Sequence, residues 1–284
     1  MPQFLFDCVA FCILVFVIAL PTFVVKLSLP FISSFDATLE VPIAFLIILY
    51  SVLFCFALLT HLVPRPKPGK YAFPYSQAVI LWGFHFSVQR VASFALFRNV
   101  FMSFNILRYL YLKSLGAKIH FQTWISSNFE FTELYEITVK KGAMLASRSE
   151  LGCHMIRDGH FLLGSVLIEE GAQILIDVGV GPDCVVGKNA VIEFGTKLGY
   201  KVHIGESTLI GNRCMLESHV KVGDRVRIGD LVTIESAVCI DDGVVIPSGT
   251  WIRRGARVTK DTVFESQRWQ EVKRVRAPHR KELC

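Results

Sequence analysis

The second half of the chain repeats one hydrophobic position every six residues. From Ile168 to Val258 every sixth residue is Leu, Ile or Val, sixteen times without exception. An α-helix repeats near every 3.6 residues and an amphipathic strand every second residue, so neither explains this spacing. A period of six predicts short strands joined by tight turns, with one side chain of each hexad pointing into a narrow core.

The positions around this repeated residue support the same interpretation. The residue after the repeated one is Gly in seven hexads. The residue four positions after the repeated one is small or β-branched, as in Ala172 and Val178. We expect Gly to adopt turn dihedrals that other residues resist. Three hexads would form one triangular coil, and each strand would pair with its counterpart 18 residues later. The register extends backward through Val139, Leu145 and Leu151, and we assign residues 118–264 to an all-β parallel β-helix.

The first part of the chain is organised differently. Phe4–Val25 is an apolar run interrupted by Asp7, and Val41–Val63 is a second run without any charge. Each is long enough to cross a hydrocarbon core of about 30 Å as a helix. A cleaved signal peptide is the alternative for the first run, but it lacks a basic start and a small-residue cleavage site. We therefore expect residues 1–70 to form two transmembrane helices with a short connection.

Charge predicts the orientation of these helices. Arg65, Lys67 and Lys70 directly follow the second run, which by the positive-inside bias places that end in the cytoplasm. The expected protein is a multi-pass protein of the inner (cytoplasmic) membrane, with its β-helix facing the cytoplasm. Residues 71–117 mix aromatic residues with Arg and Lys, which favours helices in the membrane interface. We expect residues 265–284 to be a basic tail attracted to anionic lipid and not to nucleic acid.

The hexad repeat fails at one place. Counting on from Leu151, the next core position is occupied by Arg157; Leu163 returns to register, and Ile168 follows after five residues instead of six. A solenoid that is otherwise regular has no packing reason to slip here. Such slips place loops and polar groups on one face, where binding surfaces usually form.

The irregular stretch contains a candidate catalytic pair, His154 and Asp158. An imidazole can take the proton of an amine or hydroxyl that attacks an acyl carbonyl, and a carboxylate can orient the ring. Backbone N–H groups near Gly164 could receive the developing oxyanion. Arg157, His160 and Gly164 are weaker candidates for substrate binding. The alternative is that His154 is a surface loop residue and Asp158 a turn former.

These residues also carry a resemblance. The turn Pro66–Tyr71, the lead into the first coil at Leu115–Ile119, and His154–Asp158 followed by Leu163–Val166 match a family pattern. Over roughly residues 41–260 the chain resembles the C-terminal membrane domains of ε-poly-lysine-synthetase-like amino-acid-adenylating enzymes, which are related to nonribosomal peptide synthetases. More widely, it resembles the LpxA-like hexapeptide-repeat acyltransferases.

The resemblance implies a left-handed β-helix and a membrane-anchored acyltransferase without a tightly bound cofactor. It implies a phosphopantetheine thioester as co-substrate, either acyl-CoA or an acyl or peptidyl carrier protein, and an amine or hydroxyl acceptor. Arg157 departs from the family, which has an acidic residue there, and the 284 residues contain no adenylation or carrier domain. The acyl donor is therefore left open.

Two other functions remain at this point. The solenoid could be a non-catalytic scaffold or a module that binds carrier proteins at the membrane. A zinc-dependent hydratase like the β-helical carbonic anhydrases would need three histidines, but His203 and His219 occupy different places in their hexads and do not stack. We therefore assign no metal. We expect the membrane as a partner, no nucleic acid, and a homo-oligomer, either a dimer or a trimer.

Overall fold

The computed structural model describes residues 2–262. The chain divides into a helical unit (residues 1–67, 71–117 and 158–161) and a solenoid unit (68–70, 118–157 and from 162 onward). The expected basic tail, 265–284, lies outside the described residues. We describe each unit separately.

The helical unit begins with two long apolar helices. α1 (Pro2–Ile32) and α2 (Ala37–Leu62) pack against each other and contain stretches with mean hydropathies of 2.9 and 2.7. Both are long and apolar enough to cross a membrane. The Asp36 carboxylate begins α2 by accepting a hydrogen bond from the Thr38 N–H at 3.0 Å. Large apolar side chains point outward from both helices, among them Phe11, Ile18 and Phe45, as expected for surfaces that face lipid.

Three shorter helices complete this unit, namely α3 (Gln77–Ala92), α4 (Ala95–Ser103) and α5 (Asn105–Ser114). The Ser76 hydroxyl caps α3 by accepting from the Val79 N–H. α3 and α4 meet at an angle of 73°. Residues 71–117 are thus largely helical, while their position at a membrane interface stays a prediction.

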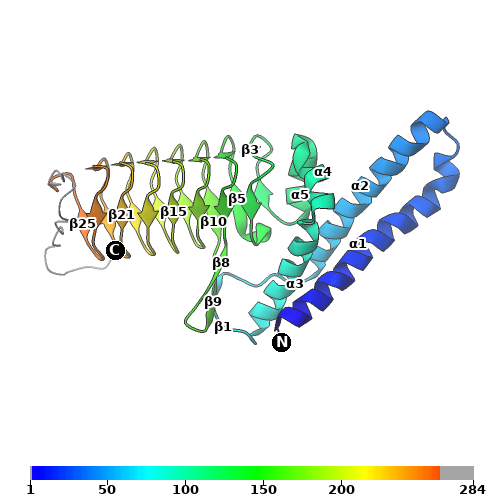
Figure 1. Cartoon of the computed structure of the whole chain (residues 1–284), viewed down its shortest axis with the longest axis horizontal. Coiled ribbons are helices and arrows are strands. Elements are labelled where there is room, and N and C mark those ends of the chain that lie inside the picture. Colours follow the sequence, from blue (N-terminus) through cyan, green and yellow to red (C-terminus); the bar gives the residue numbers. More distant parts are fainter. Residues whose placement is uncertain (1, 263–284) are drawn as a thin grey trace. The chain divides into compact units, whose positions relative to one another are not determined.

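The solenoid unit is a parallel β-solenoid of about eight turns, consistent with a left-handed β-helix. Its strands form three sheets, one for each side of the coil (Figure 1). The first sheet contains β2 (Lys118–Ile119), β5 (Ile137–Val139), β10 (Val166–Ile168), β13 (Val185–Val186), β16 (His203–Ile204), β19 (Lys221–Val222), β22 (Cys239–Ile240) and β25 (Arg257–Val258). The second contains β3 (Trp124–Ile125), β6 (Met144–Leu145), β11 (Gln173–Ile174), β14 (Val191–Ile192), β17 (Leu209–Ile210), β20 (Arg227–Ile228) and β23 (Val245–Ile246). The third contains β4 (Glu130–Phe131), β7 (Glu150–Leu151), β12 (Gly179–Val180), β15 (Lys197–Leu198), β18 (Met215–Leu216), β21 (Thr233–Ile234) and β24 (Trp251–Ile252).

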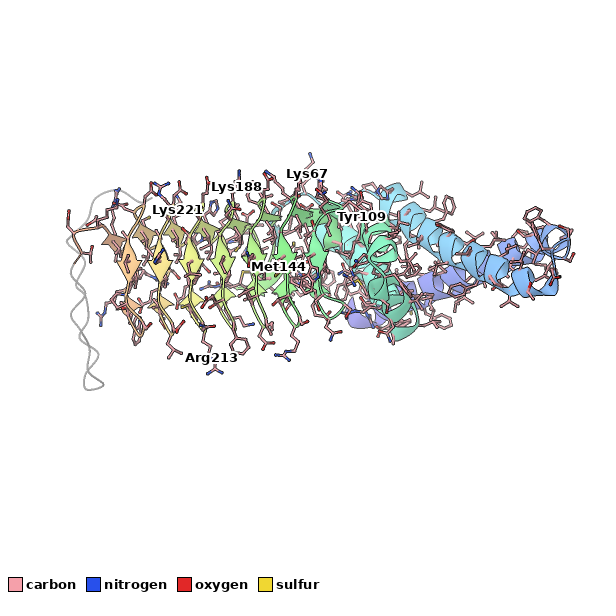
Figure 2. The ribbon with its side chains drawn as sticks, turned by 90° about the horizontal axis from the view of Figure 1, so that it is seen from above. Lys67, Tyr109, Met144, Lys188, Arg213 and Lys221 are labelled. Carbon is pink, nitrogen blue, oxygen red and sulfur yellow. The ribbon has the colours of Figure 1, made fainter. Side chains whose placement is uncertain are left out.

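The pairing confirms the predicted register. Val186 is paired with Ile204 and Ile204 with Val222, each 18 residues on. The last residue of each solenoid strand carries the core position, and Ile192 and Ile210 are fully buried. In Figure 2, Met144 marks β6, next to the terminal strand β3 of the second sheet, and Lys188 and Arg213 lie on opposite borders of this sheet.

The role expected for the glycines was wrong in one respect. The left-handed turn conformation falls on other residues, such as Asp183 (φ 62°) and Asn189 (φ 54°). The Gly that follows a core residue is required by stacking instead. A Cβ on Gly187 would lie 2.7 Å from the carbonyl carbon of Gly205 in the next coil.

The coil spacing is irregular at two places near the start. Ile119 is paired with Val139, twenty residues on, and the segment that contains the two extra residues forms a short 3₁₀ helix, η1 (Leu134–Glu136). Val139 is paired with Ile168, twenty-nine residues on. This larger insertion contains β8 (His154–Arg157) and β9 (His160–Leu163), which form a three-stranded sheet with β1 (Gly69–Ala72) in the order β1-β9-β8.

Candidate active site

The two irregular segments of the solenoid meet at one corner. β4 and β7 are neighbouring strands, with Phe131 paired to Leu151. Glu133 follows Phe131 by two residues and His154 follows Leu151 by three, so both leave the same side of adjacent coils. The structure brings them together, with Nδ1 of His154 2.8 Å from Oε1 of Glu133. The Glu133 side chain is only 2% exposed, whereas that of His154 is 23% exposed. The imidazole therefore lies against a buried carboxylate at ion-pair distance and still reaches the surface.

Local backbone bonds fix both residues. Glu133 adopts a left-handed conformation (φ 48°), and its carbonyl accepts the Glu136 N–H at 2.8 Å to start η1. The Thr132 hydroxyl accepts the Cys153 N–H at 3.1 Å, which ties the residue before His154 to the residue before Glu133. A side chain whose support is fixed in this way keeps its geometry when a substrate binds.

The thiol beside this pair is not a candidate nucleophile. Cys153 is fully buried. Burial, with a smaller contribution from the Glu133 and Glu136 carboxylates, raises the pKa of the Cys153 thiol well above its ordinary value. Because the thiolate is the reactive form, this cysteine has a structural role.

The structure places the other predicted site residues as follows. Asp158 lies in the turn between β8 and β9 with φ 50°, and its carbonyl oxygen is 2.8 Å from Nδ1 of His160. The role of Asp158 as the partner of His154 stays a prediction. The carboxylate that lies at Nδ1 of His154 in the structure belongs to Glu133. The Gly164 N–H donates to the Cys153 carbonyl at 2.8 Å, and the oxyanion contact expected from N–H groups near Gly164 stays a prediction. Gly164 is required for packing, because a Cβ there would lie 2.5 Å from the Asp183 nitrogen.

Arg157, at the end of β8, lines a surface groove of about 490 Å³. The groove follows the corner beyond the third sheet, and its other lining residues are Lys197, Leu198, Gly199, Met215, Leu216, Glu217, Ser218, Ser236 and Arg254. Neighbouring strands lie about 4.8 Å apart, so the four coils from Lys197 to Arg254 cover about 14 Å. Arg157, Lys197 and Arg254 give the lining three cations. Its carboxylate, Glu217, accepts hydrogen bonds from the N–H and hydroxyl of Ser236 at 3.0 and 2.8 Å.

His154 is not among the residues that line this groove. β8 connects the two, because it starts at His154 and ends at Arg157. Three residues of extended chain span about 10 Å. The imidazole and the near end of the groove are thus separated by the length of one short strand.

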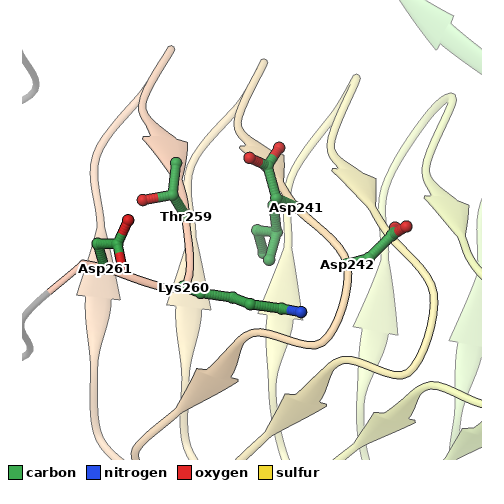
Figure 3. Close-up of a pocket in the computed structure, with 6 residues that line it drawn as sticks. Asp241, Asp242, Thr259, Lys260 and Asp261 are labelled. Atoms are coloured by element: carbon green, nitrogen blue, oxygen red, sulfur yellow. The ribbon is translucent and has the colours of Figure 1, made fainter.

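A second hollow, of about 630 Å³, lies at the last described coil (Figure 3). It is lined by Ile240, Asp241, Asp242, Thr259, Lys260 and Asp261. Asp242 accepts the Asp224 N–H at 2.8 Å and so caps the neighbouring turn. The Asp242 carboxylate therefore has a structural use in this hollow, and the lining residues form no catalytic arrangement.

Metal ligation was considered for the histidines of the solenoid. His203 lies exposed on β16, and the His219 ring packs edge-on against Tyr200, with centroids 5.4 Å apart. Within residues 2–262, no group of three or more His, Cys, Asp and Glu side chains is arranged to hold a metal ion.

Comparison with known proteins identifies the repeat. Residues 201–236 match the family described as Bacterial transferase hexapeptide (six repeats). Comparison with curated proteins gives no match.

Among solved structures, the chain is similar to the acetyltransferase domain of PglB from Neisseria gonorrhoeae, solved with acetyl coenzyme A. The identity is 19% and the TM-score 0.31, over 53% of this chain and 62% of that one. It is also similar to perosamine N-acetyltransferase from Caulobacter crescentus, solved with CoA and GDP-perosamine, at 17% identity and a TM-score of 0.33 over 54% and 58% of the two chains. A third is the UDP-N-acetylglucosamine acyltransferase of Francisella novicida, at 17% identity and a TM-score of 0.30 over 49% and 57%. The chain thus spans about three fifths of the length of these proteins, and the likeness concerns the fold alone.

Proposed function

We propose that this protein is a membrane-attached acyltransferase that moves an acyl or aminoacyl group from a phosphopantetheine thioester to an amine or hydroxyl. The observation that carries the proposal is the contact of 2.8 Å between His154 and the buried Glu133. An imidazole held at Nδ1 by a carboxylate presents Nε2 as a general base.

The reaction needs one such base. Nε2 of His154 takes the proton from the acceptor as its nitrogen or oxygen attacks the thioester carbonyl. The new C–N or C–O bond forms, the C–S bond breaks, and the imidazolium returns the proton to the leaving thiolate. Glu133 keeps the proton of the neutral ring on Nδ1 and stabilises the imidazolium. No further cofactor is needed for this balance.

The groove suits the donor. A phosphopantetheine arm is a narrow chain with an anionic phosphate at the end remote from its thioester. The groove is about 14 Å long and carries Arg254 at one end and Arg157 at the other, nearer His154 along the chain. We assign the phosphate to the Arg254 end, because guanidinium groups bind phosphate oxygens in pairs. Acyl-CoA and carrier-bound thioesters share this arm.

The helical unit gives the reaction its location. α1 and α2 are candidate membrane spans, and the cations after α2 support a cytoplasmic location of the solenoid at the inner membrane. An acceptor at or near the membrane surface follows from this attachment.

The test uses the full chain purified in detergent. Acetyl-CoA and longer acyl-CoA thioesters are offered with panels of amines and alcohols, and release of free thiol is followed. We expect His154→Gln to lower acceptor-dependent release about 10²–10⁴-fold, and His203→Gln, a change of the exposed histidine on β16, to leave it unchanged. Equal rates for wild type and His154→Gln would overturn the assignment and favour the scaffold or carrier-binding alternative.

Arg254→Ala tests the groove separately. It should raise the KM for the donor with little change in kcat, because a contact remote from the thioester contributes to binding alone. An unchanged KM would show that the donor lies elsewhere.

A further inference from the structure

The helices α4 and α5 carry apolar side chains that no neighbour in the described helical unit covers. Leu96 is 73% exposed at the start of α4, and Phe104 and Ile106, where α4 passes into α5, are each 63% exposed. Phe94, at the bend between α3 and α4, is 48% exposed. In contrast, Phe97, Phe101 and Met102 on the same helix are buried. α4 and α5 thus bury apolar side chains on one side and expose Leu96 and Ile106 on the other, with Phe94 and Phe104 exposed at their first ends.

The inner side is fixed against α2. The Phe56 ring of α2 meets Phe97 of α4 at 5.7 Å and Tyr111 of α5 at 6.3 Å, both edge to face. Phe101 stacks on Tyr111 at 5.2 Å. Phe56 is fully buried and lies six residues before the end of α2 at Leu62. At 1.5 Å per residue this contact is about 9 Å along the helix from its end.

The two halves of α2 differ in how many of their apolar side chains are exposed. In the first half, Val41, Phe45 and Ile48 are exposed, as suits a surface that faces lipid. In the second half, Val52, Cys55 and Phe56 are buried. Figure 1 shows α4 and α5 beside this half of α2. α5 thus contacts the half of α2 in which these side chains are buried, whereas the corresponding side chains of the first half are exposed.

Three cations of this region, Arg90, Arg108 and Lys113, have partners within the protein. Arg108 donates from Nε and Nη2 to the Met102 carbonyl at 3.0 and 2.6 Å, which closes the end of α4. Arg90 is paired with Asp7 of α1 at 2.7 Å. Lys113 lies over the Tyr109 ring at 5.8 Å. Charges near hydrocarbon are tolerated where they are paired within the protein in this way.

We propose that α4 and α5 are inserted into the cytoplasmic leaflet, with Phe94, Leu96, Phe104 and Ile106 in contact with phospholipid acyl chains. Together with α3, whose axis bends by 73° into α4, they form a re-entrant element beside α2 and do not simply lie on the interface. The occupant of this apolar surface is the bilayer because the surface continues the lipid-facing surface of α2. This inference rests on the proposed membrane attachment and not on the acyl-transfer chemistry.

The test places a nitroxide label on one introduced cysteine at a time in the full chain in phospholipid nanodiscs, with the eight native cysteines replaced by serine or alanine. Leu96→Cys and Ile106→Cys report on the proposed surface; both side chains are exposed, so their loss removes little packing. Ile48→Cys on α2 is the hydrocarbon reference, and Arg213→Cys in an exposed turn of the solenoid is the water reference. Collision rates with oxygen, which partitions into lipid, and with a water-soluble nickel chelate are compared.

We expect the labels at 96 and 106 to match the label at 48, with high oxygen and low nickel collision rates. Nickel access like that at 213 would overturn the inference, and so would low access to both reagents, which would show that a second protein copy covers the surface. If the label at 48 itself is open to nickel, the membrane attachment has failed, and the two failures are distinguished.

Discussion

His154 and Glu133 come from different coils of the solenoid, and their side chains meet with Nδ1 and Oε1 2.8 Å apart. Each lies in an insertion that interrupts the 18-residue spacing, and the later coils keep that spacing. The pair therefore depends on two irregularities that stack on each other.

Glu133→Gln should lower acyl transfer almost as much as loss of the base. The amide keeps the shape of the side chain but no longer stabilises the imidazolium. Because the two residues act as a unit, the double variant with His154→Gln should be no slower than the slower single variant. Steady-state thiol release on all four proteins measures this coupling. Additive losses would mean that Glu133 acts independently of His154.

Asp158→Asn distinguishes the two candidate carboxylates. Asn tolerates the left-handed conformation of this turn (φ 50°), so the variant keeps the backbone and removes only the charge. With Glu133 as the partner of the imidazole, the rate should stay within about threefold, far from the losses typical of a missing catalytic group. A loss as large as that of Glu133→Gln, in the same assay, would restore Asp158 as the orienting residue.

Gly187→Ala should destabilise the solenoid by about 1–3 kcal/mol. Its Cβ would lie 2.7 Å from backbone atoms of Ile204 and Gly205, which cannot move without shifting a coil. Gly152→Ala is the matched control, since the nearest atoms there are 3.8 Å away. Thermal unfolding followed by circular dichroism compares them, and equal midpoints for the two variants would contradict the stacking argument.

Asp230 makes stability depend on pH. The backbone and side-chain N–H groups of Asn212 donate to its carboxylate at 2.7 and 2.9 Å and hold the pKa of this carboxyl below its ordinary value. A depressed pKa stabilises the folded state above the unfolded pKa of about 3.9, and this contribution is lost as the pH falls through the folded value.

Asp230→Ser should therefore have a lower melting temperature than wild type at pH 7, and the gap should narrow below pH 4. Serine keeps a neutral acceptor, as Ser248 does for the Asp230 N–H at 2.9 Å. A gap that stays constant from pH 7 to pH 3 would mean that the ionised carboxylate contributes nothing.

Sequence reasoning reached the solenoid because its signal is local and repeated. One aliphatic residue per hexad is enough to set the register, and the pairing of Val186 with Ile204 follows from it. His154 was selected as a candidate because it stands where the repeat fails. Glu133 was missed because the register was followed back only to Val139. Continued through Phe131, Ile125 and Ile119 with two extra residues, the same pattern would have shown a second irregularity that contains Glu133.

Other features depend on contacts that the pattern does not contain. Asp158 satisfied the local spacing expected of a partner for His154, but which carboxylate reaches the ring depends on how neighbouring coils stack. The long helices were predicted at 4–25 and 41–63. In the structure α1 continues through Lys26 and Pro30 as far as Ile32. The packing of α4 and α5 on Phe56 has no sequence period at all, since it joins aromatic residues from three helices.

The constant spacing of the later coils sets the length of the groove, and this length is independent of the corner that contains His154. A further 18-residue coil inserted between β16 and β19 would lengthen the groove between Lys197 and Arg254 by one strand spacing, about 4.8 Å, and would leave the His154 corner unaltered. If the proposed donor lies in this groove, the number of coils limits the length of the arm that fits there, while the two insertions carry the His154–Glu133 pair.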